Sequence, residues 1–379
     1  MAWLSNDWAY RREITIDNTS NSNDLTDYQV KITLDNTNFD FSKANNDGSD
    51  IRFTDDDGST LLYYWIEKWD STNQEAIIWV KVPSIPASSN KTIYMYYGNA
   101  SASDASDGDN TFEFFDDASG TYSDKWVTIE GSADYATVDG KPAISLNSST
   151  TNIRTKSYQS NGAMIIEAEL YTTEVITAIQ YYQDDSPSTN ERYHARIDVR
   201  SGEKEAILKD GNFTGSEKDV FSSPNTWVSC KLIRDENGNH KWYVGGVLAD
   251  ERLNDTTYTS GYLALNHHNS GTGAVANLRV RKYADPEPTT SIGTEQAAFC
   301  ISGQVTLNGN PVENAKIRVI CQDDNTYFGD TTTDANGNYK IEGVVGSKKY
   351  HIVVEYTDGS GNKYNAESKW DITPYQQVS

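Results

Sequence analysis

Short stretches of alternating apolar and polar residues run along most of this chain. From Tyr28 to Leu34 every second side chain is apolar, and those between are Gln, Lys and Thr. Strands with one buried and one wet face have this period of two. No apolar repeat of 3.6 residues extends over the length of a helix, and Tyr, Thr, Val and Ile are frequent. The pattern predicts an all-β protein.

Three groups of predicted strands are separated by two polar segments. The first group ends at the aromatic run Ile93–Gly98, and Asn99–Asn110 follows as a linker rich in Ala, Ser and Asp. The second group closes at Asn277–Tyr283, and Pro286 and Pro288 mark the next linker. Because 379 residues are too many for one core, we expect three β-sandwich domains in series, spanning residues 1–110, 111–297 and 298–379.

The composition limits the kinds of partner that the chain is expected to bind. With 55 acidic and 32 basic residues, the formal net charge is −23. Such a surface repels phosphate backbones, so we expect no nucleic-acid partner. No apolar run is long enough to span a bilayer, so we expect no membrane insertion. The N-terminal residues lack the apolar region of a signal peptide. This leaves either a trimmed secretion signal or assembly inside the cytoplasm.

The N-terminal segment resembles a known family through several spaced motifs. They are Trp8–Ile16, Asp50–Phe53, Tyr64–Glu67, Ile78–Pro83, Tyr94–Asn99 and Phe114–Asp117. Over residues 1–120 they are similar to an uncharacterised extracellular domain family of archaea, bacteria and their viruses. That family commonly precedes a concanavalin-like (laminin-G-like) domain. It has no established activity, so the resemblance implies architecture rather than chemistry.

The second and third segments resemble two further families. In residues 111–297, the aspartate pair Asp116-Asp117, a Trp-containing strand, a hairpin and the closing strand Arg279–Tyr283 resemble a concanavalin-like jelly roll. In residues 298–379, Ile301–Thr306, Gly309–Val312 and Thr333–Tyr339 resemble the carboxypeptidase-regulatory, transthyretin-like sandwich. The end of the chain also resembles C-terminal modules in structural proteins of tailed archaeal viruses. These resemblances imply a small sandwich, a jelly roll and a transthyretin-like or immunoglobulin-like sandwich in series.

Catalytic residues are not evident. Glu167 and Glu169 lie on the same side of a predicted strand, as paired glycosidase carboxylates would. However, Glu174 follows too late to complete the tight carboxylate spacing of concanavalin-like glycosidases, and alternating Glu is ordinary on a wet strand face. The five histidines show no zinc spacing. We therefore expect no enzymatic activity.

Calcium is the one cofactor that the sequence suggests. Asp116, Asp117 and Asn277 match the places where concanavalin-like domains often hold a structural calcium, with Asn277 where those domains often have Asp. Capping and turn hydrogen bonds explain the same residues slightly better. An alternative set in the first linker consists of Asp104, Asp107 and Asp109.

Aromatic residues suggest a place for glycan binding, which needs exposed rings with polar groups nearby. The candidates in the middle domain are Tyr181, Tyr182, Tyr193 and His194. Tyr is so frequent in the chain that core positions compete with this interpretation.

Two of the three cysteines bracket a predicted hairpin. If Ile301–Leu307 and Ala315–Ile320 pair around Pro311, then Cys300 and Cys321 lie opposite each other and could form a disulfide under oxidising conditions.

These features together favour a non-enzymatic structural protein on the exterior of a tailed archaeal or bacterial virus. A tail fibre, spike or capsid turret would contribute to host attachment or particle decoration. Such parts are built by symmetry, so the expected partners are other virion proteins, further copies in a homo-oligomer, and a host surface glycan or S-layer. The alternatives are a secreted archaeal or bacterial cell-surface adhesin and a glycan-active enzyme of concanavalin-like fold.

Overall fold

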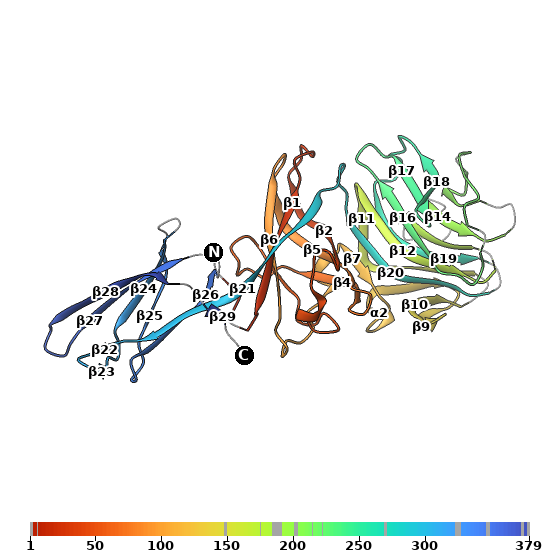
Figure 1. Ribbon diagram of the computed structural model, residues 1–379. Helices are drawn as coiled ribbons and strands as arrows, with labels where there is room; N and C mark the ends of the chain where they lie inside the picture. Colours follow the sequence, from red (N-terminus) through yellow and green to blue (C-terminus); the bar gives the residue numbers. More distant parts are fainter. Residues whose placement is uncertain are drawn as a thin grey trace. The chain divides into compact units, whose positions relative to one another are not determined.

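The protein is all-β, as expected, in a computed structural model (Figure 1). The structure describes residues 3–5, 7–147, 150–174, 176–183, 192–200, 204–213, 215–221, 223–268, 271–322, 327–345, 349–372 and 375–376. The described helices are the short η1 (Phe41–Lys43), α1 (Gly108–Thr111) and α2 (Tyr122–Lys125). None of them is long and apolar enough to cross a membrane. The chain divides into two compact units, Met1–Asp107 with Pro288–Ser379, and Gly108–Glu287.

The N-terminal sandwich contains two antiparallel sheets. One sheet has the order β21-β1-β6-β3, with β21 (Thr289–Gln304), β1 (Tyr10–Asp17), β6 (Asn90–Tyr97) and β3 (Arg52–Thr54). The other has the order β2-β5-β4, with β2 (Leu25–Asp35), β5 (Glu75–Ile85) and β4 (Tyr64–Asp70).

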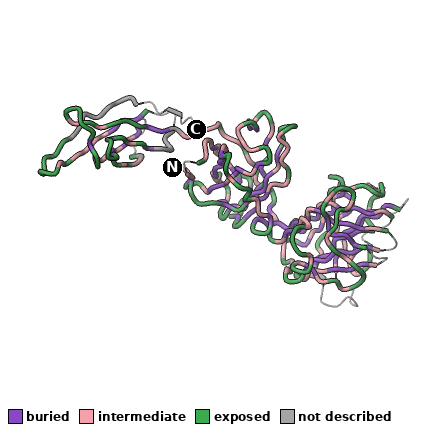
Figure 2. The backbone as a smooth tube through the Cα atoms, turned by 90° about the horizontal axis from the view of Figure 1, so that it is seen from below, coloured by how far each residue is buried: buried purple, intermediate pink, exposed green. Residues whose placement is uncertain are grey.

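The alternation predicted for β2 is confirmed with one exception. Val30, Ile32 and Leu34 are buried, and Lys31 between them is exposed. Gln29 is also buried, because its side-chain amide donates to the carbonyl of Asp27 at 3.2 Å instead of facing water. Figure 2 shows the buried residues, in purple, along the backbone of this sandwich.

The middle unit is a larger sandwich of two sheets. The eight-stranded sheet contains β18 (Val247–Arg252), β17 (His240–Val244), β16 (Val228–Arg234), β12 (Met164–Thr172), β20 (Gly273–Lys282), β10 (Lys141–Leu146) and β9 (Ala133–Val138) in that order, with β7 (Phe114–Asp116) paired to β20. The six-stranded sheet has the order β15 (Ala206–Lys209), β14 (Tyr193–Asp198), β13 (Ile176–Gln183), β19 (Ser260–His268), β11 (Thr150–Asn161) and β8 (Trp126–Glu130).

One apolar core fills the space between these two sheets. Ile166 of β12 and Trp242 of β17 come from the eight-stranded sheet, and Ile179 of β13 and Leu265 of β19 come from the six-stranded one. Since strand side chains alternate, each sheet also has a second face that this core does not use.

The C-terminal module has its own small core around Ile317, Val319 and Ile352. The strands of one sheet are β25 (Tyr327–Thr332), β24 (Lys316–Cys321), β27 (Tyr350–Thr357) and β28 (Lys363–Ile372). The second part of β21 pairs with β26 (Asn338–Val345) and β29 (Tyr375–Gln376), and β22 (Thr306–Leu307) pairs with β23 (Asn310–Pro311).

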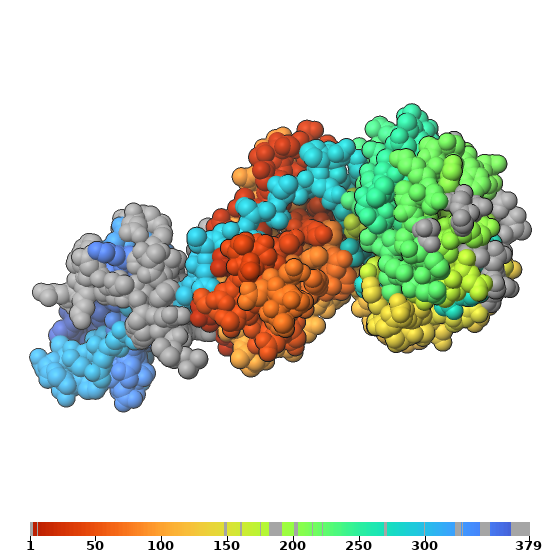
Figure 3. All heavy atoms as spheres, turned by 45° about the vertical axis from the view of Figure 1, so that its right-hand side comes forward, coloured from red at the N-terminus to blue at the C-terminus, as the bar shows by residue number. Residues whose placement is uncertain are grey.

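The domain boundary expected at residue 297 falls inside one continuous strand. The first part of β21 pairs with β1, from Thr289 opposite Asp17 to Ala297 opposite Tyr10, and the rest pairs with β26. Residues 289–297 are therefore a strand of the N-terminal sandwich and not the end of the middle domain. Their Thr- and Ser-rich sequence after Pro288 resembled a linker, yet it completes an exposed sheet edge. Figure 3 shows this stretch, in cyan, crossing the surface of the N-terminal sandwich.

The disulfide expected between Cys300 and Cys321 is not formed, and both are buried free thiols. The two strands do not pair as a hairpin: Cys300 lies opposite Glu342 of β26, whereas Cys321 lies opposite Tyr350 of β27. Cys321 belongs to the module core together with Ile301, so Cys300, one residue earlier on β21, points to the opposite face.

Candidate ligand-binding face of the middle domain

The second face of the six-stranded sheet is lined mainly by polar side chains. Ile153, Ile179, Ala195 and Leu265 point into the core, so their neighbours along each strand point the other way. We call this surface the polar face. Its residues are Asn152 and Arg154 of β11, Ala178 and Gln180 of β13, His194, Arg196 and Asp198 of β14, and Ala264 and Asn266 of β19.

The strand register arranges the polar face in two rows. One row is His194, Gln180, Ala264 and Arg154, and the next is Arg196, Ala178, Asn266 and Asn152. An alanine lies near the middle of each row, with longer polar side chains on both sides of it. The rows therefore place hydrogen-bonding groups around two small side chains.

Several polar atoms on this face are buried without a partner. Gln180 is fully buried, yet among the described residues neither its Nε2 nor its Oε1 has a hydrogen-bond partner. The same holds for Nε2 of His194 and for Oδ1 of Asn152 and Asn266. A buried polar group left unpaired costs about 1–3 kcal/mol, and folded proteins satisfy such groups with protein, water or ligand atoms. The polar face thus contains several hydrogen-bonding atoms that the described residues leave without a partner.

Two guanidinium groups on the polar face are held against aromatic rings. Arg154 lies 4.0 Å above the ring centre of Tyr262, and its Nη1 donates to the carbonyl of Thr155 at 3.0 Å. Arg196 lies 5.0 Å from the ring centre of Phe213, whose side chain is 53% exposed. Cation–π contacts of this kind fix the orientation of a guanidinium.

His194 is neutral on the polar face. Burial lowers the pKa of its imidazole to about 3, and the positive charges of Arg192, His268 and Arg196 act in the same direction. A neutral imidazole has one donor and one acceptor nitrogen. His194 therefore adds a hydrogen-bonding group and no charge.

The two tyrosines expected beside His194 are core residues, which corrects that prediction. Tyr181 and Tyr193 are fully buried, and their rings stack with centroids 5.2 Å apart. They share the strand parity of Ile179 and Ala195 and so point into the core. The side chain of Tyr182 lies outside the described residues.

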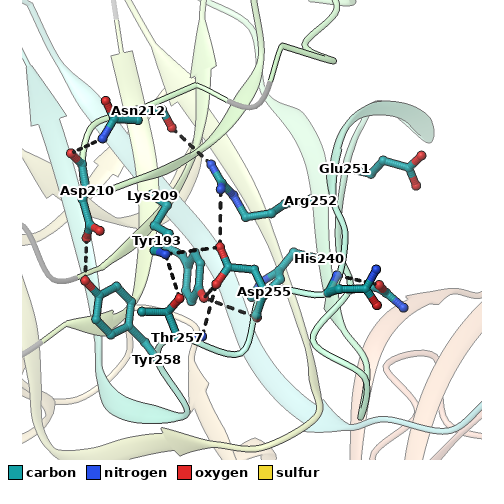
Figure 4. Close-up of polar contacts among 12 residues, drawn as sticks. Tyr193, Lys209, Asp210, Asn212, His240, Glu251, Arg252, Asp255, Thr257 and Tyr258 are labelled. Carbon is teal, nitrogen blue, oxygen red and sulfur yellow. Dashed lines mark hydrogen bonds and ion pairs between the residues drawn. The ribbon is translucent and has the colours of Figure 1, made fainter.

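A second polar cluster surrounds Asp255 in the loop between β18 and β19 (Figure 4). Its carboxylate accepts hydrogen bonds from the Tyr193 hydroxyl at 2.7 Å and from the Thr257 N–H at 3.1 Å. The same carboxylate forms ion pairs with Nη1 of Arg252 at 3.4 Å and with Nζ of Lys209 at 3.7 Å. Burial would raise the pKa of Asp255, but the hydrogen bonds outweigh it and hold the pKa at about 2. These contacts fix the loop between β18 and β19.

The residues expected to bind calcium do not fit that ion. Oδ2 of Asp116 accepts the Trp126 indole N–H at 2.5 Å and the Tyr135 hydroxyl at 2.8 Å, so donors point where a cation would have to lie. Asp117 accepts the N–H of Ser119, while the amide of Asn277 donates to Glu169. Among the described residues no group of His, Cys, Asp or Glu is arranged to hold a metal, and this includes the alternative set Asp104, Asp107 and Asp109.

The strand carboxylates Glu167 and Glu169 lie on the outer face of the eight-stranded sheet and are ion-paired. Glu167 accepts from Nε of Arg279 at 3.0 Å and Nε of Arg281 at 3.3 Å. Burial would raise the pKa of Glu167, but the charges of the two arginines outweigh it and lower the pKa to about 2. Glu169 contacts Lys141 at 2.6 Å. These contacts hold neighbouring strands together.

The sequence motifs did not identify the amides of the polar face as candidates, although the alternation along a neighbouring strand indicates this face. From Arg192 to Arg200 every second residue is polar or charged and those between are apolar or aromatic, which indicates a strand with one polar face. Gln180 lies next to an aromatic pair that resembled a glycan-contacting surface more strongly. Only the register of the sheet shows that it lies beside His194.

Two family models match parts of the chain. Residues 47–129 match a domain of unknown function (DUF2341), and residues 300–368 match the carboxypeptidase regulatory-like domain. Both matches lie where the sequence motifs indicated an N-terminal family and a C-terminal module. An uncharacterised protein of Methanocaldococcus jannaschii is 29% identical over 133 residues, which are 32% of this chain and 24% of that protein. The chain thus spans about a quarter of the length of this curated relative.

Solved structures similar to the chain are β-rich proteins of low sequence identity. A carbohydrate-binding module from Bacillus subtilis is 16% identical, with a TM-score of 0.35 and coverage of 42% of this chain and 96% of that one. A β-glucanase from Bacillus licheniformis is 15% identical, with a TM-score of 0.34 and coverage of 45% and 98%. A legume lectin-like domain from Entamoeba histolytica is 10% identical, with a TM-score of 0.32 and coverage of 43% and 92%. At such values, what these proteins bind does not transfer to this chain.

Proposed function

We propose that the middle domain binds a glycan on its polar face, and that the chain is a non-enzymatic binding and structural protein. The observation that carries this proposal is the fully buried amide of Gln180, which has no hydrogen-bond partner among the described residues. Neighbouring sugar hydroxyls each donate and accept hydrogen bonds. An amide with both atoms available can bind two of them at once.

The grouping of polar atoms on this face also supports the proposal. Ala178 and Ala264 lie between the longer polar side chains of the two rows. Asn152 and Asn266 contribute further acceptors from the row beside Gln180. A few convergent polar groups of this kind fix the orientation of a small ligand.

Binding without cleavage is favoured by the state of the carboxylates. Hydrolysis of a glycosidic bond by two carboxyl groups requires one to donate a proton and the other to act as nucleophile or base. On the polar face, Asp198 is buried and engaged by Arg196 and Arg200 at 3.5 and 2.6 Å. Glu167 and Glu169 belong to the other sheet and are ion-paired.

A location on the exterior of a virion is part of the same proposal, with a cell-surface adhesin as the alternative. It is supported by the serial β-domains and by a net charge of −23, which suit an exposed and soluble structural part. Immunogold labelling of purified particles and of host cells distinguishes the two locations, and light scattering of the purified chain tests for homo-oligomers.

Glycan binding is tested by applying the fluorescently labelled full chain to an array of polysaccharides and oligosaccharides. We expect binding to a restricted set of glycans, and its loss in Gln180→Leu, which removes both amide atoms at similar volume. Ser229→Ala, an exposed change on the eight-stranded sheet, is the matched control and should bind as the native chain does. Failure to bind any glycan, or undiminished binding by a folded Gln180→Leu variant, would overturn the proposal.

A further inference from the structure

Four Asn-Gly pairs occur along the chain, at Asn161-Gly162, Asn237-Gly238, Asn308-Gly309 and Asn336-Gly337. In such a pair the backbone nitrogen of the glycine can attack the side-chain amide carbon of the asparagine, because glycine has no side chain to hinder the approach. The reaction requires a glycine N–H that can lose its proton. Whether this N–H is already engaged in a hydrogen bond therefore distinguishes the four pairs.

In three of the pairs the glycine N–H donates to a backbone carbonyl. The three bonds are Gly162 to Thr259 at 3.2 Å, Gly238 to Asp235 at 3.2 Å and Gly337 to Asp334 at 2.8 Å. Two of these glycines, Gly238 and Gly337, are also buried. An attack on the asparagine side chain must first break the hydrogen bond, so the fold protects these three pairs.

In the fourth pair, Asn308-Gly309, the glycine N–H makes no hydrogen bond with the described residues. The pair forms the two-residue turn between β22 and β23 (Figure 1), in which Leu307 lies opposite Asn310. Both turn residues have a positive φ, +52° for Asn308 and +85° for Gly309, as in the type I′ turn that favours Asn-Gly. The hydrogen bonds of such a turn join the two flanking residues, which leaves the Gly309 N–H outside the ladder.

The surroundings of this turn leave room for the reaction. Asn308, Gly309 and Asn310 are exposed, and a Cβ placed on Gly309 would meet nothing within 4 Å. The β22–β23 ladder pairs two positions, and one of them is Pro311, which cannot donate a hydrogen bond. Water therefore reaches the turn, and few contacts resist the change of backbone angles that brings the Gly309 nitrogen to the Asn308 side chain.

We propose that Asn308 is a site of spontaneous deamidation in the folded protein. The Gly309 nitrogen bonds to Cγ of Asn308, the bond from Cγ to Nδ2 breaks, and Nδ2 leaves as ammonia with the proton of the Gly309 N–H. Water then opens the resulting cyclic imide at either carbonyl, which gives aspartate or isoaspartate. Both products add a negative charge to this hairpin, and isoaspartate also lengthens the backbone, so the type I′ turn is lost.

The test incubates the purified full chain in mildly alkaline buffer and follows the four pairs by peptide mapping with mass spectrometry, which detects the exchange of NH2 for OH at each asparagine. We expect Asn308 to deamidate at least about fivefold faster than the other three asparagines, since the net strength of one hydrogen bond changes a rate by about that factor. Deamidation of Asn308 at the same rate as the other three, or more slowly, overturns the inference.

The same measurement in urea separates the effect of the fold from that of the local sequence. Unfolding breaks the hydrogen bonds of Gly162, Gly238 and Gly337, so the four rates should become similar. If Asn308 remains faster by the same factor in urea, its neighbours in the sequence explain the rate, and the assignment to the turn is overturned.

Two variants test the site by charge, because each deamidation makes the chain more acidic. Asn308→Gly keeps a residue that accepts a positive φ, and the acidic form that accumulates on anion-exchange chromatography should nearly disappear. Asn336→Ser is the matched change in a protected pair and should leave the acidic form undiminished. Accumulation of the acidic form at the native rate in Asn308→Gly overturns the inference.

Discussion

At the scale of single residues, one five-residue loop recurs in this chain. It begins with Asp and ends with Gly-Asn, and occurs at Asp235–Asn239, Asp334–Asn338 and Asp358–Asn362. In each copy one carboxylate oxygen of the Asp accepts the backbone N–H groups two and four residues later, and the glycine has a positive φ. Local side-chain bonds of this kind define tight turns, so the sequence motif predicts the hairpin geometry directly.

Gly238 in the first of these loops should be sensitive to substitution. Its φ is +75°, and a Cβ there would lie 2.7 Å from the carbonyl oxygen of Asp255. Gly246 has a similar φ of +81° with nothing within 4 Å. We expect Gly246→Ala to cost about 1 kcal/mol from backbone strain, and Gly238→Ala about 1–3 kcal/mol more because the Asp255 loop must move. Urea unfolding followed by Trp fluorescence measures the free energy of unfolding of both variants. If the two variants lose equal free energy, the close approach of Gly238 to the Asp255 carbonyl is contradicted.

The Asp255 carboxylate should stabilise the middle domain in a pH-dependent way. Its folded-state pKa of about 2 lies below the ordinary 3.8, so the ionised group contributes stability above about pH 4 that is lost as pH falls to about 2. The difference in unfolding midpoint between the native chain and Asp255→Asn should therefore shrink between about pH 6 and pH 2.5. Glu236→Gln, an exposed change in the adjacent hairpin, should show no such trend. A difference in unfolding midpoint that stays constant with pH would show that folding does not favour the ionised form of Asp255.

At the scale of elements, β21 joins two sandwiches through one strand. Its first part completes the sheet that contains β1, and its second part belongs to the C-terminal module. We expect residues 1–297 to keep the N-terminal sandwich folded without the module, whereas residues 1–287 lose the partner of β1 and unfold at lower urea concentration. Limited proteolysis and urea unfolding of the two truncated chains measure this. Equal stability would mean that 289–297 contributes nothing to the sandwich.

The same elements show which features of the fold could be predicted from the sequence. Alternation predicted the strands and the all-β class, because the period of two is a local property. Which side of a strand faces the core depends on partners far along the chain, and for this reason Tyr181 and Tyr193 were misplaced on the surface. The pairing of Cys300 with Cys321 failed for a related reason, since neighbouring strands in the sequence belong to different sheets of the module.

At the scale of the whole molecule, most of the buried polar atoms that lack a partner among the described residues lie in the middle domain. On its polar face, the side-chain amides of Gln180, Asn152 and Asn266 have atoms without a hydrogen-bond partner among the described residues. The N-terminal sandwich and the C-terminal module have continuous cores and shared pairing through β21. We therefore propose binding for the middle domain and scaffolding for the other two, since function commonly resides in a site on a stable framework.

The central claim is that the amide of Gln180 is kept for a ligand and not for stability. The most direct measurement is the free energy of unfolding of the ligand-free Gln180→Leu variant against the native chain, by urea titration. Because the buried amide has no hydrogen-bond partner among the described residues, replacing it with an apolar group should raise stability by about 1–3 kcal/mol, while the variant no longer binds glycan. A loss of stability of similar size would show that the amide is a structural hydrogen-bonding group, and would contradict the account.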